Sequence, residues 1–446
     1  MQAIRFAETS TDLIVLHSRV VVPHAIAKTV VSVHETGKRQ YQEFCQLRFI
    51  DRTVLVCEPL KRNSLSPFSR TSSAQPKLKA KLSNVKNDCA LFSRLYIGCQ
   101  TRNGNIDEFF SHENQATPPA LSEGNSLRFG CKSDLLPCLE GFCSTADQLP
   151  NYSAIMLDGA ALVNMWRPAS GVKQTFQDYS DTVFIPKLME LLKPVSRLDL
   201  VWDSYAERSL KSATRAKRGD GIRQRVSANA PLPKNWSEFL RHDANKTELF
   251  DFLSDQVSML SIDNKQIVVT KGTSVLSASL DMNSAELPLN DCNHEEADTR
   301  LLLHAAHAAV VGHSSICIRT VDTDVVVLAV TFFFTIHCEQ LWIAFGVGKH
   351  FRHIAVHEVA NALGQNISEA LPFFHAVTGC DTVSAFAGRG KKYAWETFNL
   401  YPESVNAFQS LSSMPTTLSD TDLAVCERFV VMLYDRTSSE CSVNAS

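Results

Sequence analysis

From about residue 150 onward, short apolar runs alternate with longer stretches of helical periodicity, and this alternation constrains the fold most. Four runs rich in β-branched and other apolar residues predict strands over residues 154–157, 198–202, 316–321 and 341–345. The stretches between them repeat apolar residues with the helical period, as over 299–311. Strands that alternate with helices form βαβ units. The sequence therefore predicts an α/β fold: a central, mostly parallel sheet sandwiched by helices, with an N-terminal mixed accessory region.

The chain divides into five segments by composition. Residues 1–60 are partly helical in pattern and predict an N-terminal helical region. Residues 61–87 are rich in Ser, Pro and Lys, have no hydrophobic period and contain seven Lys or Arg residues, which is typical of a basic linker. Residues 88–149 contain scattered apolar clusters and predict an accessory region. Residues 150–400 are the predicted α/β domain, and residues 401–446 a C-terminal helix and tail.

Charge and composition limit where the protein lies and what it binds. The net charge of −3 argues against a general polyanion binder, so any nucleic-acid surface must come from local clusters of Lys and Arg. The most apolar stretch, residues 325–336, is too short to span a bilayer. The thirteen cysteines include no CxxC pair, which is typical of reduced thiols in an intracellular protein. We therefore expect an intracellular protein without a membrane partner, and favour the nucleus over the cytoplasm.

Aspartates directly follow three of the predicted strands. Asp158 follows the first strand, Asp203 the second, and Asp322 and Asp324 the third. In open parallel α/β sheets, ligand sites form in the crevice beyond the carboxyl ends of the strands. We therefore expect these four carboxylates to lie along one edge of the sheet.

Three further acids suit the same edge. Glu296 and Asp298 open the helical stretch before the third strand, where the partial positive charge of a helix N-terminus favours anions, and Asp381 lies in a loop-like TGCD segment. Any one of these acids alone is more often a cap, a turn or a surface residue. Clustered carboxylates repel one another unless a cation neutralises them, and their oxygens suit Mg²⁺ or Mn²⁺. Together the seven acids predict a site for Mg²⁺ or Mn²⁺, with two ions expected.

Two basic segments fit a phosphate backbone beside such a site. Seven basic residues lie between Arg208 and Arg225, and Lys211, Arg215 and Arg218 among them share one face of a predicted helix. A second segment, AGRGKK, follows Asp381, and small glycine turns let backbone amides approach a phosphate. Its candidate residues are Gly388, Gly390, Lys391 and Lys392. A solvated helix face and a plain turn remain the alternatives.

Taken in order, these motifs resemble the PIN-like superfamily, and within it the flap-endonuclease group of structure-specific 5′ nucleases. The matching segments are IMLDG, LVWDS with its basic helix, EEAD, VDTD, and TGCD with AGRGKK, over residues 152–395. The resemblance implies a nuclease in which the seven acids hold the metal ions. It also implies that Lys211 and Arg218 contact phosphate and that the glycine hairpin grips duplex DNA.

The sequence also departs from that group. Asp298 is one methylene shorter than the usual Glu, Ser204 replaces a Gly, and residues 226–292 carry no family motif. The first 150 residues have no counterpart in the group. We interpret the chain as a divergent, mobile-element-associated member.

These observations predict a metal-dependent nuclease that hydrolyses DNA, with RNA as a second candidate substrate, by a two-metal-ion mechanism. Nucleic acid is the expected partner, DNA more than RNA, and the sequence does not indicate which proteins the chain binds. One alternative is a PIN-like scaffold that has lost catalysis and binds nucleic acid or protein. Another is a small-molecule α/β enzyme, which requires an apolar pocket at the edge that carries the acids.

Overall fold

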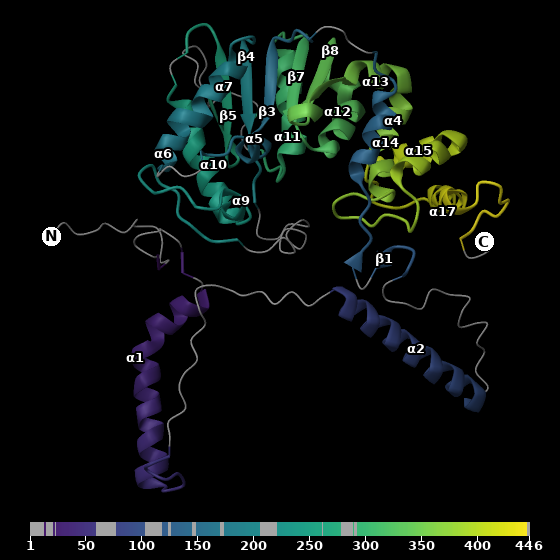
Figure 1. Cartoon of the computed structure of the whole chain (residues 1–446). Coiled ribbons are helices and arrows are strands. Elements are labelled where there is room, and N and C mark those ends of the chain that lie inside the picture. Colours follow the sequence, from purple (N-terminus) through teal and green to yellow (C-terminus); the bar gives the residue numbers. More distant parts are fainter. Residues whose placement is uncertain are drawn as a thin grey trace. The chain divides into compact units, whose positions relative to one another are not determined.

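The computed structural model of the chain, drawn in Figure 1, describes most of its residues. The chain divides into two compact units. Unit 1 comprises Met1–Ala74, Gly171–Gln177 and Asp220–Glu248, and unit 2 comprises Gln75–Ser170, Asp178–Gly219 and Leu249–Ser446. The described ranges are residues 13–14, 21–22, 24–58, 77–102, 118–123, 126–144, 149–169, 174–205, 221–260, 262–277, 289 and 292–443.

Unit 1 is small and is held by a polar network around Glu248. The Glu248 carboxylate accepts from the guanidinium groups of Arg223 and Arg225 and from the backbone N–H of Val226 at 3.0 Å. Burial would raise the pKa of Glu248, but the hydrogen bonds from Arg223 and the Val226 amide outweigh it and hold the pKa below its ordinary value. The helices of unit 1 are α1 (His24–Cys45), the π-helical turn η1 (Gln46–Ile50) and α9 (Trp236–Phe239), and α10 (Asp243–Ser258) begins in it.

Unit 2 is built on a seven-stranded sheet with the order β6-β5-β4-β3-β7-β8-β9. The five inner strands are parallel, and the two edge strands, β6 and β9, are antiparallel to their neighbours. The strands are β3 (Ala154–Asp158), β4 (Arg197–Val201), β5 (Gln266–Lys271), β6 (Ser274–Ser277), β7 (Ser315–Thr320), β8 (Gln340–Phe345) and β9 (Arg352–Ala355). The four strands expected from the sequence are confirmed as β3, β4, β7 and β8.

The chain reverses its direction of travel across the sheet at the central strand β3. From β3 it moves outward to β4, β5 and β6, and then returns to the other side of β3 to form β7, β8 and β9. The carboxyl ends of β4, β3 and β7 are therefore neighbours at a topological switch point, where open α/β sheets form their ligand crevices. The fold is the expected α/β fold with a mostly parallel sheet.

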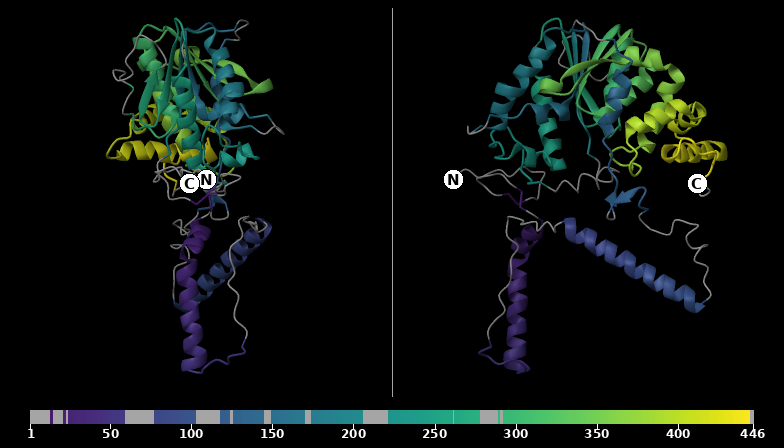
Figure 2. Two further views of the ribbon diagram at one scale, coloured as in Figure 1. Left: turned by 90° about the vertical axis from the view of Figure 1, so that its left-hand side faces the viewer. Right: turned by 45° about the vertical axis from the view of Figure 1, so that its right-hand side comes forward.

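Helices cover both faces of this sheet (Figures 1 and 2), and every residue of β3 and β4 is buried. Met156 and Ile318 face the core that includes α11 and α12, whereas Leu157 and Leu200 face the opposite side of the sheet. The helices are α5 (Gly159–Met165), α6 (Phe176–Tyr179), η3 (Ser180–Phe184), α7 (Ile185–Leu192), α11 (Ala297–Val310), α12 (Thr323–Ile336), η5 (Gly348–His350), α13 (Val356–Leu363), α14 (Gln365–Val377), α15 (Lys391–Leu400), α16 (Glu403–Ser412) and α17 (Asp420–Tyr434).

The core that contains the sheet extends beyond residues 150 and 400, the expected bounds of the α/β domain. Leu135, Leu136 and Leu139 on one side, and Phe408 and Phe429 on the other, are buried in the core that contains the sheet. The first three come from the 3-10 helix η2 (Lys132–Leu135) and from α4 (Leu136–Glu140), in the segment that the sequence assigned to an accessory region. The two-stranded β1 (Ser122–Glu123) and β2 (Ser126–Leu127) precede them.

The end of the predicted linker is a helix. Residues 77–87 of the expected basic linker belong to α2 (Lys77–Arg102), and its earlier residues lie outside those described. Among the helices that the structure describes, none is both long and apolar enough to cross a membrane. All thirteen cysteines are free thiols.

Gly159 is required where the chain turns from β3 into α5. A Cβ atom at this position would lie 2.2 Å from Cε3 of the Trp202 ring. The ring is itself fixed, because its Nε1 donates to Ser254 Oγ at 2.8 Å and it stacks on Phe250 at 4.3 Å between centroids. The close approach therefore fixes the positions of the residues that precede Gly159 and follow Trp202, which are Asp158 and Asp203.

We expect Gly159→Ala to lower the free energy of unfolding by about 2 kcal/mol, because the added methyl must displace a packed indole. Urea denaturation followed by tryptophan fluorescence measures the effect. Gly98→Ala in α2 is the matched control, since a Cβ there meets nothing within 4 Å. Equal stability of Gly159→Ala and wild type would show that the ring is not fixed in this way.

Candidate metal centre

Asp158 is the last residue of β3, and its carboxylate is fixed by two hydrogen bonds. It is the N-cap of α5, where Oδ1 accepts from the backbone N–H of Ala161 at 2.9 Å. Oδ2 accepts from Thr320 Oγ1, at the end of the neighbouring strand β7, at 3.1 Å. The side chain is therefore buried and oriented before any ligand arrives.

Asp203 lies beyond the end of β4 and joins that strand to the start of α11. Its Oδ1 accepts from the backbone N–H of Ala297 at 2.9 Å, and its Oδ2 accepts from the Tyr205 hydroxyl at 3.1 Å. Glu296 is the N-cap residue of α11 and is half-buried. The expected proximity of the β4 end and the Glu296–Asp298 segment is therefore present.

Asp298, Asp322 and Asp324 form a compact group. Each offers a carboxylate oxygen that lies within 4.8 Å of those of the other two. Asp322 is the N-cap of α12, and its Oδ1 accepts from the backbone N–H of Asp324 at 2.9 Å. Acids from the first turn of α11 and the first turn of α12 thus converge, as the sequence predicted.

Asp381 joins this group through a lysine that the sequence did not single out. Lys132 Nζ lies 2.6 Å from Asp322 Oδ1, 3.1 Å from Asp324 Oδ2 and 3.2 Å from Asp381 Oδ2. Burial alone would lower the pKa of Lys132, but the charges of Asp322 and Asp324 outweigh it and raise the pKa above its ordinary value. The ammonium therefore stays charged at neutral pH and contacts three carboxylates.

His375 is a further partner of the acids. Its Nε2 lies 3.0 Å from Asp324 Oδ1. Burial would raise the pKa of Asp324, but His375 and Lys132 outweigh it and lower the pKa to about 2. Since this carboxylate is ionised and can only accept, the imidazole carries its proton on Nε2. Burial also lowers the pKa of His375 itself, so the ring is neutral near pH 7.

The other half of the acid cluster consists of Asp158 and Asp203, and the ionised form of Asp158 is unfavourable there. Burial, followed by repulsion from Asp203, raises the pKa of Asp158 to about 7, against hydrogen bonds from Ala161 and Thr320 that favour the charged form. Within the described part of the chain, no Lys or Arg forms an ion pair with Asp158 or Asp203. The charge of Arg319 acts on Asp158, but without a direct ion pair.

These residues fit a divalent cation. The donors are carboxylate oxygens, which suit hard ions such as Mg²⁺ and Mn²⁺. The ammonium of Lys132 shows that a cation can contact three of the carboxylates at once. The seven predicted acids are placed on the ends of three adjacent strands, the starts of α11 and α12, and the loop after α14.

Gly379 fixes that loop. Its φ is +102°, and a Cβ there would lie 2.8 Å from the Cβ of Ala385. Ala385 in turn donates its backbone N–H to Arg128 O at 2.8 Å. Asp381 is thus held on a loop that packs against the segment preceding Lys132.

The residues predicted to contact nucleic acid differ in where they lie in the structure. Lys211, Arg215 and Arg218 lie outside the described residues. Gly388 has a φ of +70° and open space around it, Gly390 is the N-cap of α15, and Lys392 is exposed. Lys391 is buried, and its Nζ donates to His375 O at 2.7 Å and Thr378 Oγ1 at 2.9 Å. The prediction that Lys391 contacts nucleic acid does not fit this burial, which assigns it to holding α14 against α15.

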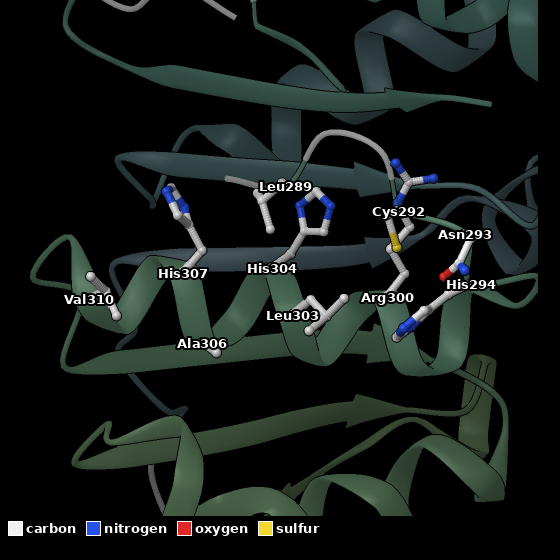
Figure 3. Close-up of a pocket in the computed structure, with 10 residues that line it drawn as sticks. All are labelled: Leu289, Cys292, Asn293, His294, Arg300, Leu303, His304, Ala306, His307 and Val310. Atoms are coloured by element: carbon white, nitrogen blue, oxygen red, sulfur yellow. The ribbon is translucent and has the colours of Figure 1, made fainter. Parts of the chain in front are cut away.

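A cavity of about 380 Å³ lies along the flank of α11 (Figure 3). Arg300, His304 and His307 project into it from successive turns of the helix, and Cys292 and His294 close the end near its start. None of the seven acids is among the described residues that line it. The small-molecule alternative required an apolar pocket at the acids, and this cavity does not supply one.

Asp199 shows that an acid in the same strand can be purely structural. It is fully buried in the middle of β4, where both of its oxygens accept from Arg197 at 2.7 Å and Oδ2 lies 2.7 Å from His304 Nδ1. Burial would raise the pKa of Asp199, but Arg197 and His304 outweigh it and lower the pKa. It is a core acid, in contrast to Asp203 four residues later.

We expect Asp199→Ala to lower the free energy of unfolding by about 3 kcal/mol, because it leaves the buried Arg197 without a counter-ion. Asp203→Ala, at the end of the same strand, is the comparison and is expected to cost clearly less. Chemical denaturation of both variants measures the difference. An equal loss in the two variants would contradict the division between core acid and site acid.

No protein-family profile matches the sequence, and no curated protein matches it either. Among solved structures, a complex of the bacteriophage T5 flap endonuclease with DNA and metal ions aligns over 63% of this chain and 86% of its own, with 11% identity and a TM-score of 0.34. The catalytic core of Rad2 in complex with DNA aligns over 69% of this chain and 83% of its own, with 12% identity and a TM-score of 0.33. Any function of this chain has to be inferred from its own site.

Proposed function

We propose that this chain is a metal-dependent nuclease that hydrolyses phosphodiester bonds of DNA, with RNA as the second candidate substrate. The observation that carries the proposal is the meeting of carboxylates at the switch point of the sheet. Asp158 and Asp203 lie close enough to repel, and Asp298, Asp322 and Asp324 offer oxygens within 4.8 Å of one another. Buried like charges are costly, so such a cluster is best explained by a cation that binds it.

The proposed ion is Mg²⁺ or Mn²⁺. Asp158, Asp203, Glu296, Asp298, Asp322, Asp324 and Asp381 are the residues that would hold it, some of them through water. A divalent ion there supplies an electrophile for phosphate oxygens and makes water a stronger nucleophile at neutral pH. Seven carboxylates are numerous enough for the two ions that the sequence predicts, and the occupancy of the second position depends on Lys132.

The chain's own groups orient the carboxylates for that task. Thr320 and the Ala161 amide fix Asp158, the Ala297 amide and Tyr205 fix Asp203, and His375 fixes Asp324. Ligands held by such partners need little reorganisation when a cation binds.

The proposed contacts to the phosphate backbone come from basic and glycine residues near the acids. Lys211, Arg215 and Arg218 remain proposals from the sequence. Gly388, Gly390 and the exposed Lys392 lie at the start of α15, where backbone amides are open to an anion. These contacts would position the strand and carry no sequence preference.

A second candidate function is favoured by one observation. Lys132 already neutralises three of the acids without a metal. A scaffold that had lost catalysis and bound nucleic acid or protein could keep its acids in that form. The two candidates differ in whether the purified chain cleaves.

The test is cleavage of end-labelled flap, single-stranded and duplex DNA, and of single-stranded RNA, by the purified chain. We expect shortened strands with Mg²⁺ or Mn²⁺ and intact strands with EDTA. Asp322→Asn is the matched inactive control. The nuclease function would be rejected if the substrates stayed intact with both metals while circular dichroism showed the protein to be folded. The binding module would then remain as the candidate function.

A further inference from the structure

The ammonium of Lys132 occupies a position among the acids that a metal ion would otherwise take. Its Nζ lies within 3.2 Å of one oxygen each of Asp322, Asp324 and Asp381. Three carboxylates around one cation is a ligand arrangement typical of a divalent-ion site. Lys132 thus places a permanent positive charge where this half of the cluster needs one.

Lys132 stands on a segment that is anchored on both sides. On the C-terminal side, Leu135, Leu136 and Leu139 are buried in the core beneath the sheet. On the N-terminal side, Arg128 O accepts from the backbone N–H of Ala385 at 2.8 Å. The backbone of Lys132 is therefore fixed at a position from which the side chain reaches the three acids.

Contacts further along hold the same segment. Glu140 pairs with Arg352 of β9 at 2.5 Å, and the hydroxyl and amide of Ser144 both donate to Glu358 of α13 at 2.6 Å. Displacing the lysine backbone would have to break these contacts as well as expose the buried leucines. A side-chain rotation alone would leave Asp322, Asp324 and Asp381 without the ammonium that they contact.

The ammonium of Lys132 contacts only one of the two halves of the acid cluster. Asp322, Asp324 and Asp381 contact Lys132, and Asp324 also contacts His375. Asp158 and Asp203 accept hydrogen bonds only from neutral donors in the described part of the chain. A cation entering the site therefore meets two carboxylates without a cationic contact on one side and a lysine on the other.

We propose, as an extension that rests on the nuclease function, that Lys132 replaces one of the two metal ions, so that the site holds a single divalent ion in the half formed by Asp158 and Asp203. The ammonium then supplies the fixed positive charge of the second position. Mg²⁺ or Mn²⁺ at the first position remains essential for cleavage.

Calorimetric titration of the full chain with Mn²⁺, in the absence of nucleic acid, tests this proposal. We expect wild type to bind one ion and Lys132→Met, which keeps the apolar stem and removes the charge, to bind two. Lys132→Arg keeps a positive charge and is expected to bind one ion. Lys193→Met removes an exposed lysine that precedes β4, at the edge of the sheet opposite the acids, and should behave as wild type.

A melting experiment provides a second readout that does not depend on cleavage. Without metal, Lys132→Met should melt below wild type, because three acids lose their counter-charge. Saturating Mn²⁺ should then raise the Tm of Lys132→Met by more than that of wild type, because the variant binds an additional ion.

Two ions bound by wild type, with affinities within about threefold of those in Lys132→Met, would overturn the proposal and leave the nuclease function standing. Zero ions in wild type and in Lys132→Met, each shown to be folded, would overturn both. One ion in both wild type and Lys132→Met would show that Lys132 blocks nothing, and would also overturn the proposal.

Discussion

Asp158→Asn should lower the rate of cleavage by about 10³-fold, because it removes one negative charge from the ion-binding position and keeps the side-chain shape. Asn retains a carbonyl oxygen for the Ala161 amide, so the turn from β3 into α5 should persist. The measurement is single-turnover cleavage of a labelled substrate by both proteins at equal Mg²⁺ concentration.

The same variant should be as stable as wild type or more stable when metal is absent. Burial and the charge of Asp203 make the ionised form of Asp158 unfavourable in the folded chain. Loss of activity without loss of stability separates a functional acid from a structural one. Asp263→Asn, an exposed acid outside the cluster, is the control and should cleave at the wild-type rate. Cleavage by Asp158→Asn at the wild-type rate would show that Asp158 does not belong to the metal site.

Without metal, the stability of the folded chain should contain a pH-dependent contribution from Asp158 on the order of 4 kcal/mol. Its pKa is raised by burial, and then by Asp203, from 3.8 to about 7. Between these values the folded state keeps a proton that the unfolded state has lost. Stability therefore falls as pH rises through this window and levels off above it.

The measurement is the free energy of unfolding in EDTA from below pH 4 to above pH 7. The difference between wild type and Asp158→Asn isolates the contribution, because other titrating groups are common to both proteins. Added Mg²⁺ should reverse the trend, since it binds the ionised form and stabilises the fold more as pH rises. A difference that stays constant with pH would show that Asp158 titrates normally in the folded chain.

Much of the sheet could be predicted from the sequence because its inner strands are continuous apolar runs. β3, β7 and β8 have this form, and each is buried on both faces. β5 and β6 were missed although a signal exists, since an apolar run is followed by a turn at Gly272, which has a φ of +56°. β9 is short and polar at its start, so alternation gives it no clear pattern.

The acids of the site could be predicted because each follows a local sequence pattern. A strand end or a helix start fixes where Asp158, Asp203 and Asp322 must lie, and the sheet order brings those ends together. Asp199 lies within β4, four residues before Asp203. Only the structure reveals that Arg197 neutralises Asp199.

Lys132 could not be predicted in the same way. It is 190 residues from Asp322 and 249 from Asp381 in sequence, and no local pattern links them. Its position depends on the burial of Leu135, Leu136 and Leu139, which the sequence places in an accessory region. A contact that depends on tertiary packing alone produces no periodic pattern in the sequence.

Anomalous diffraction from a crystal of the full chain grown with Mn²⁺ tests the metal site most directly. We expect a manganese peak among the seven carboxylates, adjacent to Asp158 and Asp203, and its loss in Asp158→Asn. Ordered acids without any manganese peak among them, at a Mn²⁺ concentration that supports cleavage by other nucleases, would contradict it.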